Sequence, residues 1–98
     1  MAIEVHVTGR VRLGGLSAFQ LAVAEYITFR QGAGYVVPRV LSGISGEMNL
    51  VRMVYLYPTA SDYETECGRK LSDPQYGSVA MKMPFVEGTL GYEVFVVA

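Results

Sequence analysis

Cysteine and histidine are almost absent from this 98-residue sequence, which has only Cys67 and His6. A single cysteine cannot form an intramolecular disulfide, so the simplest interpretation is a protein of a reducing compartment. Zinc sites need several cysteines or histidines, and calcium sites need clustered carboxylates; neither pattern is present, so we predict no metal site. The glycine-rich residues 9–15 also lack the spacing of a phosphate-binding loop.

Charge is scarce as well. Charged residues make up 17% of the sequence, the formal net charge is −1, and 51% of the residues are hydrophobic. Without a basic excess, we expect no nucleic acid and no membrane surface as a partner. No apolar run reaches the ~20 residues of a membrane span, and the first residues do not resemble a signal peptide, so we expect a cytoplasmic protein. So many apolar residues with so few charges indicate that oligomerisation hides part of the surface.

Residues 48–58 are the stretch around which the chain is organised. They predict a strand whose two faces are both largely apolar, with Leu50, Arg52, Val54 and Leu56 on one face and Val51, Met53, Tyr55 and Tyr57 on the other. Such a strand needs cover on both sides. One small domain has helices enough for one face only, so the other face requires a partner.

The N-terminal half predicts a strand, a helix and a second strand. Residues 3–8 alternate between apolar and polar, as in a half-buried strand. Residues 16–31 have the spacing of an amphipathic helix, with Ser17 as a candidate cap. Residues 35–45 predict an edge strand, because Pro38 cannot donate to a ladder, and a turn at 46–47 completes a hairpin.

After the central strand, Thr59 or Ser61 can cap a second helix, whose apolar side would carry Ala60, Tyr63, Cys67 and Leu71. Residues 76–84 predict a short, poorly ordered helical piece, and residues 92–97 a final strand. The order β-α-β-β-α-β predicts an α+β, ferredoxin-like antiparallel sheet in the order 4-1-3-2, with the helices on one face. A second copy packed on the open face would give a homodimer with a barrel-like core.

A resemblance to a known family adds to this prediction. The segments that carry it are Glu47–Val51, Met53–Tyr57, the capped helix that follows, and Leu71–Tyr76. They resemble the dimeric α-β barrel superfamily and, within it, the NIPSNAP group; related members include antibiotic-biosynthesis-type monooxygenases and isomerases. The resemblance implies a dimeric α-β barrel formed by residues 1–98, and it implies fold more directly than chemistry.

His6 and Arg52 are the candidate catalytic residues. His6 can act as an acid or base oriented by Glu4 or by the final strand; the alternative is a hydrogen-bonded interface residue. Arg52 stands in an apolar strand, where a charge must be paired. It can stabilise an enolate or phenolate, or it can pair with Glu4 or Glu93.

Aromatic residues near these positions are candidate walls for a substrate-binding pocket. They are Tyr55, Tyr57, Tyr92 and Phe95, which would join Glu4 in contacting the ligand. Phenols beside an apolar wall suit a planar or carbonyl-bearing organic molecule. The alternative is that the same rings pack in the core or in the dimer interface.

Three functions are compatible with the sequence. The first is a small dimeric enzyme that acts on an apolar aromatic or polyketide-like molecule by proton transfer or cofactor-independent oxygenation. We expect no dedicated cofactor, so an oxygenase would use the substrate itself or a borrowed haem or flavin. The second is a non-catalytic NIPSNAP-like ligand-binding or stress-related domain whose cavity is mostly filled by side chains. The third is a subunit interaction module.

Overall fold

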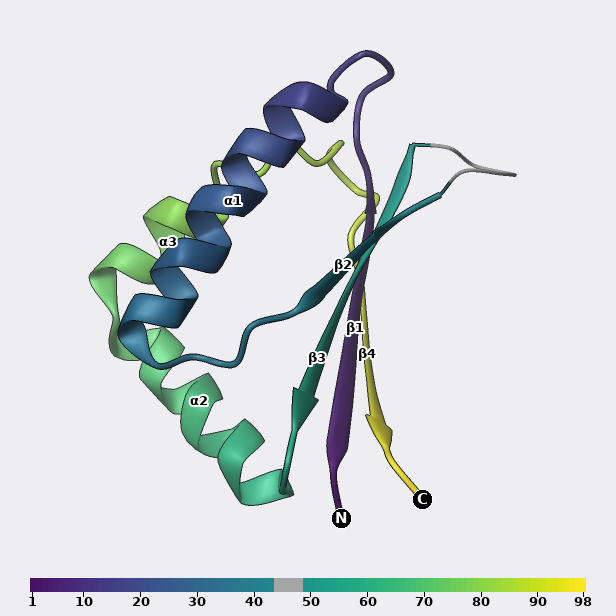
Figure 1. Cartoon of the computed structure of the whole chain (residues 1–98). Coiled ribbons are helices and arrows are strands. Elements are labelled where there is room, and N and C mark those ends of the chain that lie inside the picture. Colours follow the sequence, from purple (N-terminus) through teal and green to yellow (C-terminus); the bar gives the residue numbers. More distant parts are fainter. Residues whose placement is uncertain (44–48) are drawn as a thin grey trace.

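The computed structural model describes residues 1–43 and 49–98 of the chain. Its elements, in order, are β1 (Ile3–Arg10), α1 (Leu16–Ala33), β2 (Arg39–Ser42), β3 (Leu50–Tyr57), α2 (Ala60–Ser72), α3 (Pro74–Ala80) and β4 (Gly91–Val96). The four strands form one sheet in the order β2-β3-β1-β4, and all three pairings are antiparallel. Figure 1 shows the three helices on the same side of the sheet. The predicted α+β, ferredoxin-like topology is confirmed.

The central strand β3 has the alternation that its sequence predicts. Its inward side chains are all buried: Val51, Met53, Tyr55 and Tyr57. Opposite them across β1 lie Ile3, Val5, Val7 and Gly9. Because directly paired residues point to the same face of a sheet, these two rows form one apolar surface under the helices.

Helix α1 begins and ends at glycines. Gly15 is its N-cap and forms no side-chain cap bond, so the prediction of Ser17 as the cap is wrong; Ser17 lies within the first turn. Gly34 ends the helix with φ 78°, a left-handed conformation that glycine adopts without strain. The helix buries Phe19, Val23, Tyr26 and Arg30, which follow one another at steps of three and four.

Thr59 caps α2: its Oγ1 accepts a hydrogen bond of 3.1 Å from the backbone N–H of Asp62. Ser61 therefore lies inside the helix. Asp73 ends α2 and caps α3, accepting a 3.0 Å bond from the N–H of Gln75. The predicted inner side of α2 is wrong at both ends, because Ala60 is exposed and the surface of Leu71 is 91% exposed. The helix instead buries Glu66, because its inner side faces polar groups that need a carboxylate.

The remaining elements begin or end at residues other than those predicted. β2 covers only residues 39–42, and Pro38 is buried just before it. The helical piece expected near residues 76–84 is helix α3, which ends at Ala80; its first residue is Pro74, the position at which Asp73-Pro74 predicts a new turn. Three predicted features lie outside the described residues. They are the turn at residues 46–47, the end of the second strand and the first residue of the central stretch.

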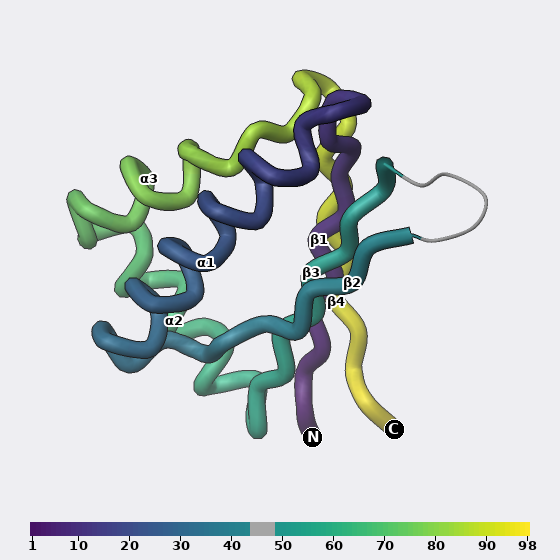
Figure 2. The backbone as a smooth tube through the Cα atoms, turned by 45° about the horizontal axis from the view of Figure 1, so that its top comes forward, coloured from purple at the N-terminus to yellow at the C-terminus, as the bar shows by residue number. Residues whose placement is uncertain are grey.

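The two faces of the sheet have different cover. Over the face opposite the helices there is no element of the described chain, as Figures 1 and 2 show. The helices cover the β4 edge only in part: Tyr92, Val94 and Val96 pair with the helix-side residues of β1 and are still about half exposed, although the Tyr92 hydroxyl lies 2.7 Å from that of Tyr63 on α2. Among the described residues, none of the helices is long and apolar enough to cross a membrane.

Candidate functional site

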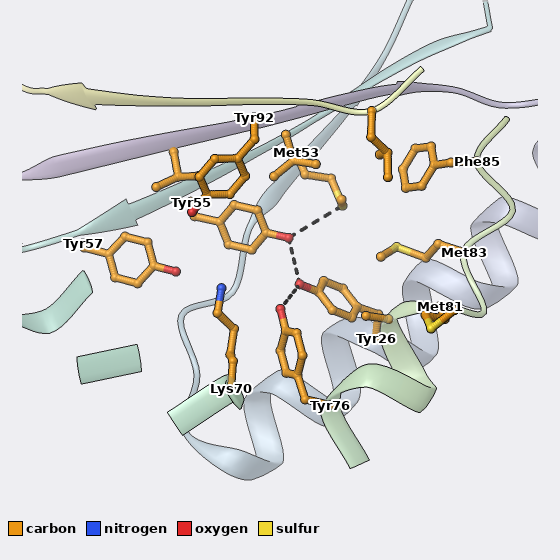
Figure 3. Close-up of a pocket in the computed structure, with 14 residues that line it drawn as sticks. Tyr26, Met53, Tyr55, Tyr57, Lys70, Tyr76, Met81, Met83, Phe85 and Tyr92 are labelled. Atoms are coloured by element: carbon orange, nitrogen blue, oxygen red, sulfur yellow. Dashed lines mark hydrogen bonds between the residues drawn. The ribbon is translucent and has the colours of Figure 1, made fainter. Parts of the chain in front are cut away.

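A cavity of about 410 Å³ lies between the helix side of the sheet and the helices (Figure 3). Strands β1, β3 and β4 provide one wall, and α1, α2, α3 and the segment before β4 provide the other. The lining residues are Val5, Val7, Tyr26, Met53, Tyr55, Tyr57, Lys70, Tyr76, Ala80, Met81, Met83, Phe85, Leu90 and Tyr92. Met81, Leu90 and Tyr92 are exposed, so the cavity opens to solvent beside them.

The segment after α3 closes one end of the cavity with apolar side chains. Its path is fixed by a bridge between Val11 and Phe85 and by the N–H of Val86, which donates to the carbonyl of Arg10 over 2.7 Å. The Phe85 ring lies against Gly9, where an added Cβ would approach the ring to 2.6 Å. Glycine at this position therefore lets the segment pack closely against β1.

Three tyrosine hydroxyls meet at the inner end of the cavity. The Tyr26 hydroxyl lies 2.8 Å from that of Tyr55 and 2.8 Å from that of Tyr76. Behind them, Arg30 Nη1 donates to Tyr26 over 3.1 Å and to Tyr76 over 2.8 Å. The cavity thus has apolar walls and one hydroxyl-lined end, an arrangement typical of sites for small organic molecules.

A buried ion pair supports this hydroxyl cluster. Arg30 is fully buried and donates through Nη2 to Glu66 Oε2 over 2.7 Å. Glu66 also accepts from the backbone N–H of Val36 over 2.6 Å and from the hydroxyl of Tyr57. In the described residues, no buried side-chain nitrogen or oxygen is left without a hydrogen-bond partner. The pair is therefore satisfied and rigid, as a buried charge requires.

Burial raises the pKa of all four of these tyrosines, Tyr26, Tyr55, Tyr57 and Tyr76, above the usual value. Loss of solvent disfavours the charged phenolate in each case. The hydroxyls around the inner end of the cavity therefore stay protonated at neutral pH. They act there as hydrogen-bond donors rather than as bases.

The sheet divides the residues predicted for the site into two groups. Tyr55, Tyr57 and Tyr92 line the cavity on the helix side, although Tyr92 lies at its open mouth with 55% of its surface exposed. The second group consists of Glu4, His6, Arg52 and Phe95, which lie together on the opposite face. Within the part of the chain that the structure describes, β1 and β3 lie between the two groups and keep them on opposite faces.

On the open face, Glu4, His6 and Arg52 form a hydrogen-bonded chain. Arg52 Nη1 lies 2.8 Å from His6 Nδ1, and His6 Nε2 lies 2.6 Å from Glu4 Oε1. A guanidinium can only donate, so Nδ1 accepts and the ring proton is on Nε2, where it reaches Glu4. The Phe95 ring packs edge-on against His6 at 5.0 Å between centroids. Arg52 thus binds His6 rather than forming the alternative pair with Glu4 or Glu93.

The sequence predictions missed Tyr26, Arg30, Glu66, Lys70 and Tyr76 at this site. One signal was available: Arg30 stands in the apolar stripe of α1, four residues after Tyr26, and a buried charge requires a partner. Nothing in the sequence identifies Glu66, 36 positions away, as that partner. Within the described residues, no three histidine, cysteine, aspartate or glutamate side chains gather as a metal site would require.

Several solved structures share this fold. A NIPSNAP family protein from Agrobacterium tumefaciens (Atu5224) superposes with a TM-score of 0.77 at 15% identity, covering 100% of this chain and 94% of that one. An uncharacterised NIPSNAP domain protein from Burkholderia xenovorans gives 0.74 at 23% identity, with 100% and 95% covered. A candidate antibiotic biosynthesis monooxygenase from Caulobacter crescentus gives 0.76 at 14% identity, with 99% and 90% covered.

No protein-family model matches the sequence, and no curated protein sequence is significantly similar to it. At these low identities the structural similarities establish the fold and not the chemistry. The chain has the ferredoxin-like fold of NIPSNAP proteins and of an antibiotic biosynthesis monooxygenase-like protein, as the sequence resemblance predicts.

Proposed function

We propose that this protein binds a small, flat, largely apolar molecule in the cavity on the helix side of the sheet. The observation that carries the proposal is the cavity itself, whose 410 Å³ lies within the ~300–1,000 Å³ of ligand sites. A domain with a cavity filled by side chains, as the non-catalytic hypothesis predicts, would not leave this space. The aromatic rings and methionines of the wall suit a planar partner, since both adapt to flat apolar surfaces.

Filling the cavity tests this proposal. Ala80 lines it at the end of α3, so Ala80→Phe should occupy the space and weaken binding of methyl 2-naphthoate, a neutral aromatic probe, at least tenfold. Titration of the probe's fluorescence measures the affinity. Ala18→Phe, on the exposed side of α1, is the matched control and should bind like the original protein. Equal binding by both variants would place the probe elsewhere and remove the proposal.

A second copy of the chain is the partner that we propose for the open face. This face exposes Leu41, Leu56 and Phe95, and its charges are arranged so that two copies complement each other. The acids Glu4 and Glu93 lie on β1 and β4, and the arginines Arg39 and Arg52 lie on β2 and β3. A two-fold axis parallel to the strands would bring the acidic half of each copy over the basic half of the other.

Leu56→Asp tests the dimer, because it places a charge within the apolar part of this face, where Leu56 is 57% exposed. Sedimentation should show a dimer for the original protein and a monomer for the variant. Leu71→Asp is the control, since Leu71 is even more exposed but lies on α2, away from the open face. A stable monomer of the unmodified protein at micromolar concentration would exclude the second copy.

Catalysis between the two open faces of the dimer is the second candidate function, and the Glu4–His6–Arg52 chain supports it. We propose that Arg52 leaves His6 Nδ1 to bind the oxygen of an apolar aromatic or polyketide-like ketone. The freed Nδ1 then takes a proton from the carbon beside the carbonyl, giving an enolate held by Arg52 and an imidazolium held by Glu4. Return of the proton to another carbon would be an isomerisation, and reaction of the enolate with oxygen would be a cofactor-independent oxygenation.

Hydrogen–deuterium exchange into 2-tetralone, an apolar aromatic ketone, tests this step by NMR. His6→Ala should abolish exchange above the uncatalysed rate while leaving the dimer intact. Tyr57→Phe, on the helix side, should retain it. A normal rate in the His6 variant would remove His6 from the mechanism, and no exchange by the original protein would leave ligand binding as the function.

A further inference from the structure

The hydroxyl cluster at the inner end of the cavity has one consistent direction of hydrogen bonding. Arg30 Nη1 donates to both Tyr26 and Tyr76, so both oxygens accept. If Tyr76 donates to Tyr26 and Tyr26 donates to Tyr55, the first two hydroxyl protons each lie between two oxygens. The reverse order would leave the Tyr76 proton with no acceptor among the described residues. The favoured direction therefore runs from Arg30 through Tyr76 and Tyr26 to Tyr55.

This chain ends at a donor with a poor acceptor. The Tyr55 hydroxyl points to Met53 Sδ at 3.9 Å, and a thioether sulfur accepts hydrogen bonds weakly. Both residues line the cavity. Figure 3 shows the two hydrogen bonds of the Tyr55 hydroxyl, with Tyr26 and with Met53, at the inner end of the cavity. Each donor in a chain polarises the next, so the guanidinium strengthens Tyr55 as a donor. Burial raises the pKa of Tyr55, so the proton stays on its oxygen.

Lys70 adds a positive charge beside this donor. It is half-buried on the inner side of α2, lines the cavity, and has its ammonium 5.6 Å from the centre of the Tyr76 ring. Figure 3 shows the Lys70 nitrogen directed toward Tyr55 and Tyr57. Of the described carboxylates, none forms an ion pair with it, and the nearby Glu66 is already bound by Arg30, Val36 and Tyr57.

The inner end of the cavity therefore offers donors and lacks a matching acceptor. We infer that the cavity recognises an oxyanion, either a carboxylate or a phenolate, on an apolar body, and that Tyr55 and Lys70 bind it. This inference rests on the proposed ligand-binding function and assigns the chemical class of its ligand. The anion replaces the sulfur as the acceptor for Tyr55 and pairs with the ammonium, while the apolar body lies along Val7, Met83 and Phe85.

A pair of probes that differ only in charge tests the inference. 2-Naphthoate carries a carboxylate, and its methyl ester has the same ring system without the charge. We expect 2-naphthoate to bind about tenfold more tightly than the ester, because a hydrogen bond to a charged group contributes ~1.5–3 kcal/mol. 4-Nitrophenol provides the phenolate arm: binding should shift its absorbance toward that of the phenolate at a pH where the free probe is mostly neutral.

Two variants assign the anion to its donors. Lys70→Met should reduce 2-naphthoate affinity about tenfold and leave the ester unchanged, and Tyr55→Phe should reduce the affinity for 2-naphthoate about tenfold and that for the ester, whose carbonyl oxygen is neutral, by less. Lys82→Met, which removes an exposed charge paired with Glu25, is the control and should bind 2-naphthoate normally. Equal affinities for acid and ester, together with no shift of the 4-nitrophenol absorbance toward that of the phenolate, would overturn the oxyanion inference and leave the proposed function intact. If neither probe binds, the ligand-binding function fails and the inference fails with it.

If the protein prefers only one of the two anions, the carboxylate or the phenolate, over its neutral form, the inference holds. The preferred anion then identifies which of the two groups the ligand carries. A preference for 2-naphthoate that survives both variants would place the anion at another group and overturn the assignment to Tyr55 and Lys70. Urea unfolding of each variant shows whether it is folded. Lys70→Met removes no core side chain, so it keeps the test decisive if Tyr55→Phe is unstable.

Discussion

The two faces of the sheet each hold an arginine in a hydrogen-bonded group that includes a glutamate, and the surroundings of the two groups differ. On the helix side, Arg30 is 0% exposed and is held by Glu66, two tyrosine hydroxyls and a backbone carbonyl. On the open side, Arg52 is half-buried and bonds to His6, which has Glu4 as its other partner. The difference indicates that the first group is a fixed support for the cavity, whereas the second can exchange its partners.

Breaking the buried pair should have the largest effect on stability. Arg30→Met removes the cation and leaves Glu66 buried, with a side chain only 7% exposed, and without its charge partner. We expect the free energy of unfolding, measured in urea, to fall by about 3–5 kcal/mol, as for other buried charges that lose a partner.

Arg52→Met is the matched change on the open face. In an unpaired subunit its neighbours Glu4 and His6 are partly exposed, with side-chain exposures of 36% and 19%, so water can replace the lost hydrogen bond. Both arginine changes are therefore compared in the monomeric Leu56→Asp background. The expected loss is below about 1 kcal/mol. Equal losses for the two variants would contradict the contrast between a fixed and an exchangeable arginine.

High pH should also destabilise the folded protein, through the buried tyrosines on the helix side of the sheet. An unfolded tyrosine loses its proton near pH ~10, whereas burial raises the pKa of Tyr26, Tyr55, Tyr57 and Tyr76 in the folded protein. Unfolding above pH ~10 therefore releases protons, so stability is fully present below that pH and is lost as the pH rises. Each such tyrosine should lower the free energy of unfolding by about 1.4 kcal/mol per pH unit.

Urea unfolding at a series of alkaline pH values measures this slope. Tyr55→Phe should reduce it by the contribution of one tyrosine, and the difference between the two proteins cancels every contribution that they share. An unchanged slope would mean that the Tyr55 hydroxyl ionises as easily in the folded protein as in the unfolded chain. Such a hydroxyl could not be the buried donor at the end of the Arg30 chain.

The strands and their faces could be predicted because alternation carries that information directly. The same alternation placed Arg52 on one face of β3 and Tyr55 and Tyr57 on the other. A single pocket formed by His6, Arg52, Tyr55 and Tyr92 therefore conflicts with the strand pattern, and the structure separates these residues accordingly. The pattern predicts which residues share a face, and it does not predict which face has the cavity.

The polar centre of the helix side could not be predicted to the same degree. Arg30, Glu66 and Tyr76 come from three helices, and their contacts depend on how those helices pack on the sheet. Apolar spacing placed Leu71 on the inner side of α2, although the helix turns Glu66 and Lys70 inward instead. Residue hydrophobicity is a poor guide where a buried arginine requires a carboxylate.

A further small effect is predicted at the start of α2, the helix that carries Glu66 and Lys70 to the cavity. Thr59→Ala removes the side-chain bond to the N–H of Asp62, which leaves a helix-end donor without its cap, and should cost about 1 kcal/mol in urea unfolding. Ser61→Ala is the control, because Ser61 is exposed inside the first turn and should change stability by less than ~0.5 kcal/mol. If the Ser61 variant lost more than the Thr59 variant, the helix would begin at Ser61, and the direction in which α2 presents Glu66 and Lys70 would have to be reassigned.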